Sequence, residues 1–171
     1  MPDRVHIPEV VEPDEKLPRD LVALRRFAYL MDEAIAIKGT PIKIGLDAVL
    51  GLIPGVGDII GGVLSTWIVI GALRHRVPAR IIVRMVLNIV IDLIGGAVPV
   101  AGDVFDFLYE ENMKNMRLLE KHRDRTRPPR STMSIAFVAA LIVAFVLAVA
   151  IGLVAALAFV IFWIIGKRSV I

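Results

Sequence analysis

One segment near the C-terminus constrains this chain more than any other feature of its sequence. Residues 133–165 form a run of 33 without a charged side chain, in which Ser134 is the polar exception. A membrane-spanning helix needs about 20 consecutive apolar residues, so the run is long enough to cross a bilayer. Hydrophobic residues make up 57% of the whole chain, above the roughly 45–50% of soluble domains. We therefore expect a membrane protein, with the lipid bilayer as its first partner.

The run is too long for one helix that stands upright in a membrane. As a helix it would measure about 50 Å at 1.5 Å per residue, whereas the hydrocarbon core is about 30 Å thick. Two arrangements of the transmembrane segment, residues 133–166, stay open: a single long helix, or a hairpin that turns near Gly152. Small residues recur from Ala139 to Ala156 at helical spacing and would allow close helix contacts. We expect a homo-oligomer.

Basic residues flank the run on both sides. Lys167 and Arg168 follow it, and a linker of residues 123–132 that carries four arginines precedes it. Because basic flanks stay in the cytoplasm, we expect a cell (inner) membrane protein whose main domain faces the cytoplasm. Outside residues 132–171, 18 of the 20 basic residues stand against 17 acidic ones. The pI of about 9.5 therefore does not indicate nucleic-acid binding.

The sequence lacks the residues that most catalytic and metal sites require. It has no cysteine and three scattered histidines, which excludes thiolate chemistry and disfavours a zinc site. Neither a phosphate-binding loop nor a serine nucleophile elbow is present. The glycines of residues 55–61 resemble a dinucleotide fingerprint, but the third glycine comes one place late. We expect no enzyme activity, no cofactor and no metal ion.

The remaining 122 residues are expected to form an arm and a helical domain. Residues 1–18 combine four prolines with charged residues, which is typical of a flexible arm without a signal peptide. An amphipathic helix is predicted from Arg19 to Lys38, because apolar residues recur there at three- and four-residue steps. Its predicted buried face consists of Leu21, Leu24, Ala28, Met31 and Ile35.

Four shorter apolar segments follow, at residues 42–52, 59–73, 80–94 and 104–119, separated by turns that contain proline. None is long enough to span a membrane. The pattern D-x-x-x-G-x-x-P-x-x-G-D occurs twice, 45 residues apart, beginning at Asp47 and at Asp92. Such a repeat indicates two copies of a helix–turn–helix unit, residues 42–73 and 80–119. The predicted fold is all-α: a membrane-associated helical bundle over residues 19–122, followed by the transmembrane segment.

The acidic residues of the repeat are the candidate functional residues. Asp58 and Asp103 follow the turn glycines, where a carboxylate caps the next helix. Asp47 and Asp92 lie inside apolar stretches, where a buried carboxylate is costly unless it is paired. Two interpretations stay open for this pair. Each aspartate accepts amides of its own or its sister turn, or the two meet and hold a cation or a proton.

Further polar side chains accompany the second copy. Arg84, Asn88 and Asp92 form a stripe along one helix, interpreted either as an internal network in which the arginine neutralises a carboxylate or as a hydrophilic path between helices. Asp103 and Asp106 lie with Glu110 on one face of the fourth segment, which we expect to be solvated. Asn112 and Asn115 are expected to cap or to hydrogen-bond neighbouring backbone.

At these motifs the chain resembles the DUF4112 family, over about residues 20–122. The resemblance rests on the Leu46–Asp58 segment, on the second copy of the repeat from Arg84 to Asp106, and on the asparagines and leucines of residues 112–119. The acidic pair Glu110–Glu111 departs from the family pattern. Because the family has no known function, the resemblance implies a helical membrane-associated fold and supplies no substrate, cofactor or catalytic residue.

We therefore expect a non-enzymatic membrane protein with a structural or interaction role, exerted through an oligomeric helical domain. The alternative is a small ion or proton channel or transporter, in which Asp47 and Asp92 line a polar path. The sequence identifies no protein partner.

Overall fold

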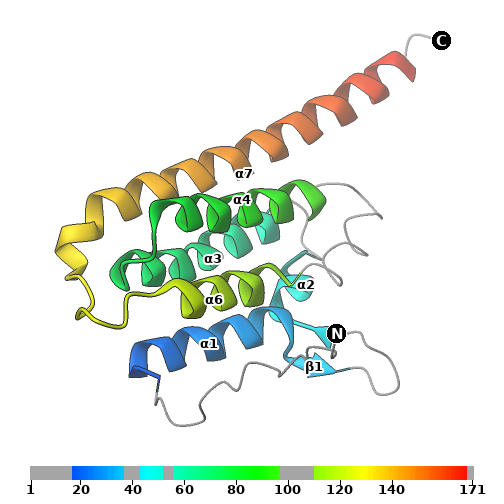
Figure 1. The fold of residues 1–171 in the computed structure, drawn as a ribbon. Coiled ribbons are helices and arrows are strands. Elements are labelled where there is room, and N and C mark those ends of the chain that lie inside the picture. The colour runs from blue at the N-terminus through cyan, green and yellow to red at the C-terminus, as the bar shows by residue number, and fades with distance from the viewer. Residues whose placement is uncertain (1–16, 37–42, 52–55, 97–109, 169–171) are drawn as a thin grey trace, which may run out of the picture.

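A computed structural model describes residues 17–36, 43–51, 56–96 and 110–168 of the chain, and an all-α fold is confirmed there (Figure 1). Two strands of two residues each accompany the helices. The elements are, in order, α1 (Arg19–Asp32), β1 (Ile35–Ala36), β2 (Lys43–Ile44), α2 (Leu46–Gly51), α3 (Val56–Arg74), α4 (Ala79–Gly96), α6 (Glu111–His122) and α7 (Thr132–Arg168).

Helix α1 has the predicted amphipathic face but ends earlier than predicted. Leu21, Leu24, Ala28 and Met31 are buried. The helix stops at Asp32 instead of Lys38, because β1 pairs antiparallel with β2, with Ile35 opposite Ile44. Ile35 is consequently exposed, so its assignment to the buried helical face is wrong.

A close backbone contact fixes where α2 begins. Gly45 lies between β2 and α2, and a Cβ atom on it would stand 1.5 Å from the carbonyl oxygen of Met31. Only glycine permits this approach. Helix α2 therefore has six residues, whereas α4, which holds the equivalent part of the second repeat, has 18. The two copies differ in length, and the second turn, within residues 97–109, lies outside the described residues.

Helix α3 begins at Val56, two residues before Asp58. The predicted N-cap position of Asp58 is therefore wrong, and Asp58 lies in the first turn. The far end of α3 closes with a left-handed residue, Arg76, at φ 58°. The amide of Val77 donates to the Ala72 carbonyl at 3.0 Å, as in a Schellman cap. Pro78 then precedes α4, so the chain reverses within four residues.

Helix α3 is the centre of the bundle, in contact with α1, α2, α4, α6 and α7. Helix α7 covers one side of the α3–α4 pair, and α1 and α6 lie on the other (Figure 1). The layers meet at Gly62 of α3, where an added Cβ would stand 3.1 Å from Leu93 of α4 and 3.4 Å from Val146 of α7. The core is formed by 18 buried apolar side chains from α1, the α3–α4 pair, α6 and α7.

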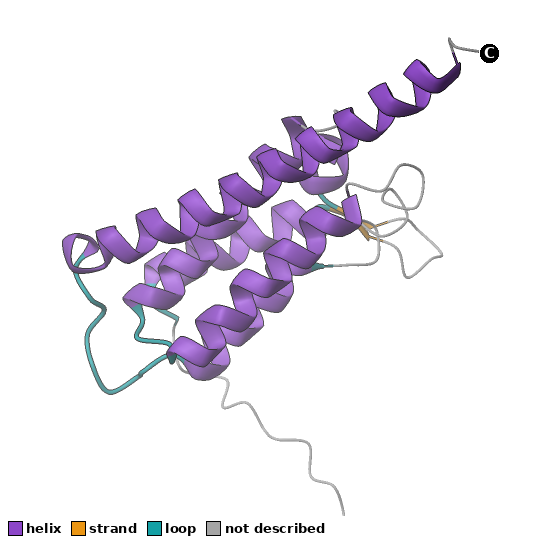
Figure 2. Ribbon diagram, turned by 90° about the horizontal axis from the view of Figure 1, so that it is seen from above, coloured by secondary structure: helices purple, strands orange, loops and turns teal. Residues whose placement is uncertain are grey.

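The C-terminal run forms one helix, α7, and not the hairpin. Gly152, the expected turn, continues the helix, and nothing lies within 4 Å of the Cβ it would carry. The first half of α7 packs on α3 and α4 through Ile135, Val146 and Ala150. Seen from above, α7 passes over the other helices and continues beyond them (Figure 2).

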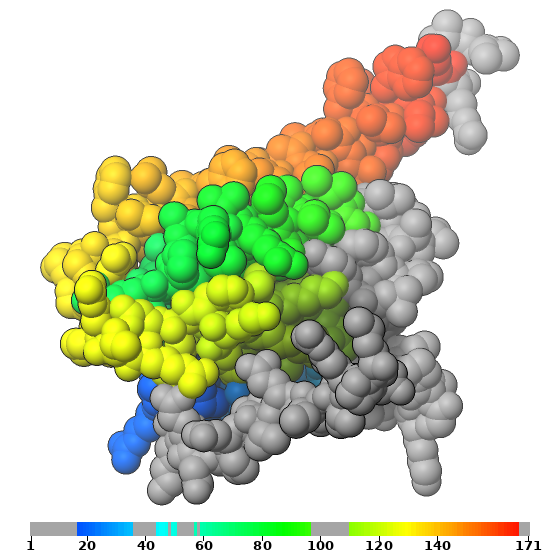
Figure 3. Space-filling view, in the orientation of Figure 1, coloured from blue at the N-terminus to red at the C-terminus, as the bar shows by residue number. Residues whose placement is uncertain are grey.

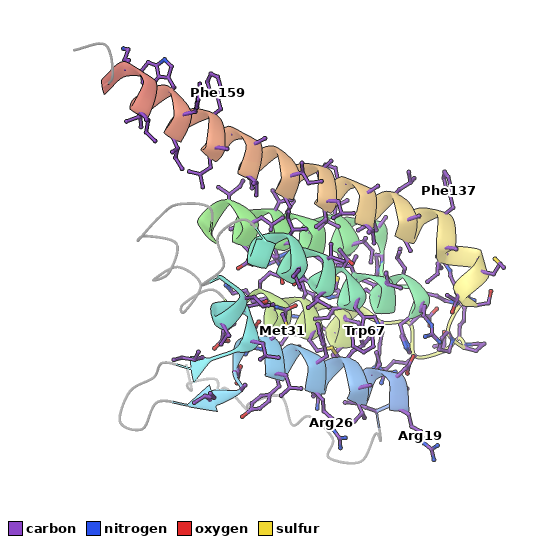
Figure 4. All side chains as sticks on the ribbon, turned by 180° about the vertical axis from the view of Figure 1, so that it is seen from behind. Arg19, Arg26, Met31, Trp67, Phe137 and Phe159 are labelled. Carbon is purple, nitrogen blue, oxygen red and sulfur yellow. The ribbon has the colours of Figure 1, made fainter. Side chains whose placement is uncertain are left out.

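The second half of α7 projects from the bundle. In the space-filling view its C-terminal part extends away from the other helices (Figure 3). Phe159 is 69% exposed, and Figure 4 shows it pointing away from the helices, as does Phe137 near the start of α7. Among the described residues, no side chain beyond Leu153 packs against the core.

The linker before α7 is held against the α3–α4 turn by hydrogen bonds. The amide of Arg130 donates to the Arg74 carbonyl at 2.8 Å, and the amide of Asp124 donates to the His75 carbonyl at 3.0 Å. The buried ring of His75 also bonds Asp20 of α1, with 2.8 Å between Nε2 and Oδ2. These contacts fix the direction in which the chain enters α7.

Candidate functional site

Eight polar side chains converge from five helices at the end of the bundle where α1 stops and α6 begins. We call this set the polar cluster. Its members are Asp32 of α1, Asp47 of α2, Ser65 of α3, Asn88 and Asp92 of α4, and Glu111, Asn112 and Asn115 of α6.

Asn112 joins α6 to α1 and α2. Its Nδ2 donates to Oδ1 of Asp32 at 2.9 Å and to Oδ2 of Asp47 at 2.7 Å. The second oxygen of Asp32 accepts the backbone amide of Met113 at 2.7 Å. The first turn of α6 thus supplies its free amide to a carboxylate, as a helix N-terminus does. One amide side chain holds two carboxylates from different helices.

Asp47 lies close to the α3 backbone. A Cβ on Gly61 would stand 3.2 Å from Oδ1 of Asp47, so a larger residue at position 61 would press on the carboxylate. The side chain of Asn112 is a partner of Asp47 that neither sequence interpretation includes. The turn of residues 52–55, on which the turn-amide interpretation depends, lies outside the described residues.

Glu111 is the most deeply buried acid of the polar cluster, at 1% exposure. Its Oε1 accepts Nδ2 of Asn115, and its side chain is also hydrogen-bonded to Ser65 of α3. Asn115 further donates to the Met85 carbonyl at 3.1 Å and accepts Nδ2 of Asn88 at 2.8 Å. This chain of amides links α4, α6 and α3 around one carboxyl group.

Burial and neighbouring charges shift the titration of these acids. Burial, followed by the charges of Asp92, Asp32 and Asp47, raises the pKa of Glu111 well above its usual value. Burial also raises the pKa of Asp32 to about 6, although its hydrogen bonds to Met113 and Asn112 oppose the change. Burial thus makes both Glu111 and Asp32 harder to ionise than free carboxylic acids, and Glu111 more than Asp32.

The structure brings together part of the predicted network. Asp47 and Asp92, the two repeat acids, both act electrostatically on Glu111, and Asn88 takes part through Asn115. Arg84 does not: it is exposed, and among the described residues it forms no salt bridge. It stands two turns before Asp92 on α4, about 12 Å along the axis, so the described residues do not show it neutralising Asp92.

The other predicted residues lie outside what the structure describes. Asp103 and Asp106 belong to residues 97–109, and the side chain of Asp58 is not among those described. Within the described residues, no group of three or more histidine, aspartate or glutamate side chains is arranged to hold a metal ion.

Sequence reasoning missed the centre of the cluster, which is formed by Asp32, Glu111 and Asn112. Asp32 reads as part of the polar face of α1, and Glu111 as a departure from the family pattern. The expectation that Asn115 bonds neighbouring backbone is confirmed at Met85. One signal could have identified Glu111. It precedes Asn115 by four residues, and side chains at this spacing lie on the same face of a helix.

A comparison with known protein families identifies the family of this chain. The model of DUF4112, a domain of unknown function, matches residues 20–123. This chain belongs to the DUF4112 family. The matched residues contain the complete polar cluster, whereas the exposed half of α7 lies beyond them. No curated protein and no solved structure matches the chain.

Proposed function

We propose that this DUF4112 protein is a non-enzymatic, membrane-anchored helical domain with a structural or interaction role. The observation that carries the proposal is α7. Residues Thr132–Lys167 are long and apolar enough to cross a bilayer, and most of their large apolar side chains are exposed. An apolar surface of this size on a helix end without a protein partner in the fold fits a lipid environment.

The packing of α7 on the bundle also limits how deeply α7 can insert into the membrane. The part that projects beyond Leu153, residues 154–166, would extend only about 20 Å, whereas a bilayer core is about 30 Å thick. The span must then include residues that pack on α3 and α4. Because Val146 lies level with Gly62 and Leu93, the adjoining ends of α3 and α4 would meet the membrane surface. Ile60, Ile91 and Ile94 are exposed apolar residues at those ends.

Charge supports a cytoplasmic position for the bundle. The linker before α7 carries Arg123, Arg125, Arg127 and Arg130, whereas Lys167 and Arg168 follow the apolar run. More basic residues therefore lie on the bundle side, which the positive-inside rule places in the cytoplasm. A location in the cell membrane, with the bundle inside the cell, is the proposed topology.

Small residues support an oligomer formed through α7. Ala140, Ala144, Ala148 and Gly152 follow one another at four-residue steps, and all four are exposed. Such a stripe lets the backbones of two helices approach closely, and its Ala148 and Gly152 end falls within the proposed span. A homo-oligomer that pairs α7 with its copy would present several bundles on one membrane face, consistent with an interaction role.

Alkaline carbonate extraction of membranes tests the anchor. The intact chain should stay in the membrane pellet, and Ala156→Arg should move it to the supernatant, because an arginine in the middle of a span costs about 2.5–3.5 kcal/mol on insertion. Ala136→Arg is the matched control: it places the same charge at an exposed alanine of α7 where the helix accompanies the bundle. Extraction of the unchanged chain, or equal behaviour of the two variants, would contradict the anchor.

A second function, conduction of ions or protons, is favoured by one observation. Asp47 and Asp92, from the two copies of the repeat, both act on the buried Glu111. Acids sheltered within a membrane protein commonly belong to proton or ion pathways. In liposomes the conduit predicts flux that Asp47→Asn and Asp92→Asn abolish while the helical content is kept, and that Asp124→Asn in the linker leaves unchanged. Absence of flux in the unchanged protein would leave the structural role alone.

A further inference from the structure

Two buried oxygen atoms of the polar cluster have no hydrogen-bond partner within the part of the chain that the structure describes. They are Oε2 of Glu111 and Oδ1 of Asn112, on residues that are 1% and 0% exposed. An amide oxygen accepts hydrogen bonds and an ionised carboxylate only accepts them. An unmatched buried acceptor is costly, and a charged one more so. Two acceptors without donors at neighbouring residues indicate that a positive group or a hydrogen atom belongs between the cluster's oxygens.

The charges around Glu111 point in the same direction. Three carboxylates face it: Asp32 from α1, with Glu33 beside it, Asp47 from α2 and Asp92 from α4. Helix α3 contributes the neutral Ser65. Helix α6 itself adds Glu110, Lys114 and Arg117, and Arg117 pairs with Glu110 at 3.4 Å and with Glu33 at 3.8 Å. The ammonium of Lys114 is influenced by Asp32, Asp92 and Glu111. One lysine does not balance the remaining carboxylates, so an ionised Glu111 would add a negative charge where negative charge is already in excess.

We propose that Glu111 is a proton-binding site, protonated at neutral pH, with the proton on Oε2. The proton removes one charge from the polar cluster. The proton also turns Oε2 from an acceptor without a partner into a hydrogen-bond donor. Carboxylate and amide oxygens of the cluster have lone pairs that can accept such a bond. Oε1 keeps its hydrogen bond from Asn115.

The donors of the cluster favour a proton over a metal ion. Nδ2 of Asn112, Nδ2 of Asn115 and the amide of Met113 already direct hydrogen atoms at the carboxylates, and such groups repel a cation. The described carboxylates are also not grouped as metal ligands. The inference rests on this geometry and on neither the membrane anchor nor conduction, so each can fail separately.

Infrared spectroscopy of the full-length protein in liposomes tests the site. At pH 7 the unchanged protein should show the C=O stretch of a protonated carboxylic acid, and Glu111→Gln should abolish that band. Glu120→Gln is the matched control on the same helix, since Glu120 is partly exposed and pairs with Arg25 at 2.7 Å; it should leave the band in place. Absence of the band from the unchanged protein, or its persistence in Glu111→Gln, overturns the proposal.

A second measurement does not depend on whether Glu111→Gln folds. The pH at which the band of the unchanged protein disappears should fall when a neighbouring charge is removed by Asp47→Asn or Asp92→Asn, because those charges favour the proton. A midpoint that is equal in both variants and the unchanged protein contradicts the site. Loss of the band at pH 7 on addition of excess Mg²⁺ or Ca²⁺ would also contradict it, because the cluster would then prefer a metal ion.

Discussion

The interior of this protein is held together by amide side chains as much as by apolar packing. Asn112 donates to two carboxylates at once, and Asn115 connects a backbone carbonyl, a glutamate and a second asparagine. Buried acids are tolerated only when groups of this kind satisfy them. The polar cluster therefore determines how α1, α2, α4 and α6 meet at one end of the bundle.

Removal of the Asn112 amide should be the most damaging polar substitution of α6. Asn112→Ala removes the hydrogen bonds that Nδ2 donates to Asp32 and Asp47, and a hydrogen bond to a charged group contributes about 1.5–3 kcal/mol. We expect the free energy of unfolding to fall by about 3 kcal/mol, measured by chemical denaturation in detergent. Lys121→Ala, at an exposed position in the last turn of α6, should change it by less than about 1 kcal/mol. Equal losses would mean that Asn112 does not join the helices.

Stability should fall as the pH rises through the titration of Asp32. Its pKa is raised from 3.8 to about 6, so the folded state holds the proton more tightly than the unfolded chain. The stabilisation that this tighter proton binding gives the folded state is fully present below pH 3.8, and it is lost as the pH rises through about 6. Between pH 4 and 6.5 the free energy of unfolding of the unchanged protein should fall by up to about 3 kcal/mol more than that of Asp32→Asn. Parallel stability curves for the two proteins would contradict this assignment.

Only part of the polar cluster could be predicted from the sequence. Asp47 and Asp92 are recognisable because each interrupts an apolar stretch. Glu111 and Asp32 are not, because they stand in ordinary charged segments, and their burial is decided by which helix packs over them. Periodicity along one helix gives the face on which a residue lies, but not the side chains that other helices bring to it.

At the scale of elements, the ends of α1 and α2 depend on contacts distant in sequence. The pair of strands and the approach of Gly45 to Met31 end one helix and delay the next. The prediction of helices over 59–73 and 80–94 is close to the observed α3 and α4, because those segments are apolar, continuous and bounded by proline. Strands of two residues are too short to leave an alternating pattern in the sequence. A prediction from helical periodicity alone therefore placed the end of α1 too late.

Gly45→Ala tests this contact. The added methyl would overlap the Met31 carbonyl, which is rigid backbone at the end of α1, so β2 or α1 must shift. We expect a loss of at least about 2 kcal/mol in the free energy of unfolding. Gly152→Ala is the control, since open space surrounds that helical glycine, and it should be neutral or stabilise the helix by up to about 1 kcal/mol. A harmless Gly45→Ala would show that the backbones do not approach closely.

The whole molecule has two unlike sides. Helices α1 and α6 carry most of the charged residues of the bundle, whereas α7 on the opposite side exposes large apolar side chains such as Phe145 and Phe159. The apolar run of α7 made the membrane prediction possible from sequence alone. Its packing along α3 and α4 was not predictable, because lipid and protein partners select the same apolar residues. That packing, and not the length of the run, places the ends of α3 and α4 at the proposed membrane surface.

Depth-dependent fluorescence quenching tests this central claim most directly. The chain has no cysteine, so one fluorophore can be attached in turn at Ala156→Cys, Ile94→Cys and Ala136→Cys in liposomes. We predict quenching by bromines deep in the acyl chains at position 156, by quenchers near the headgroups at position 94, and by aqueous iodide at position 136. Iodide quenching at all three positions, or deep quenching at position 136, would contradict the account.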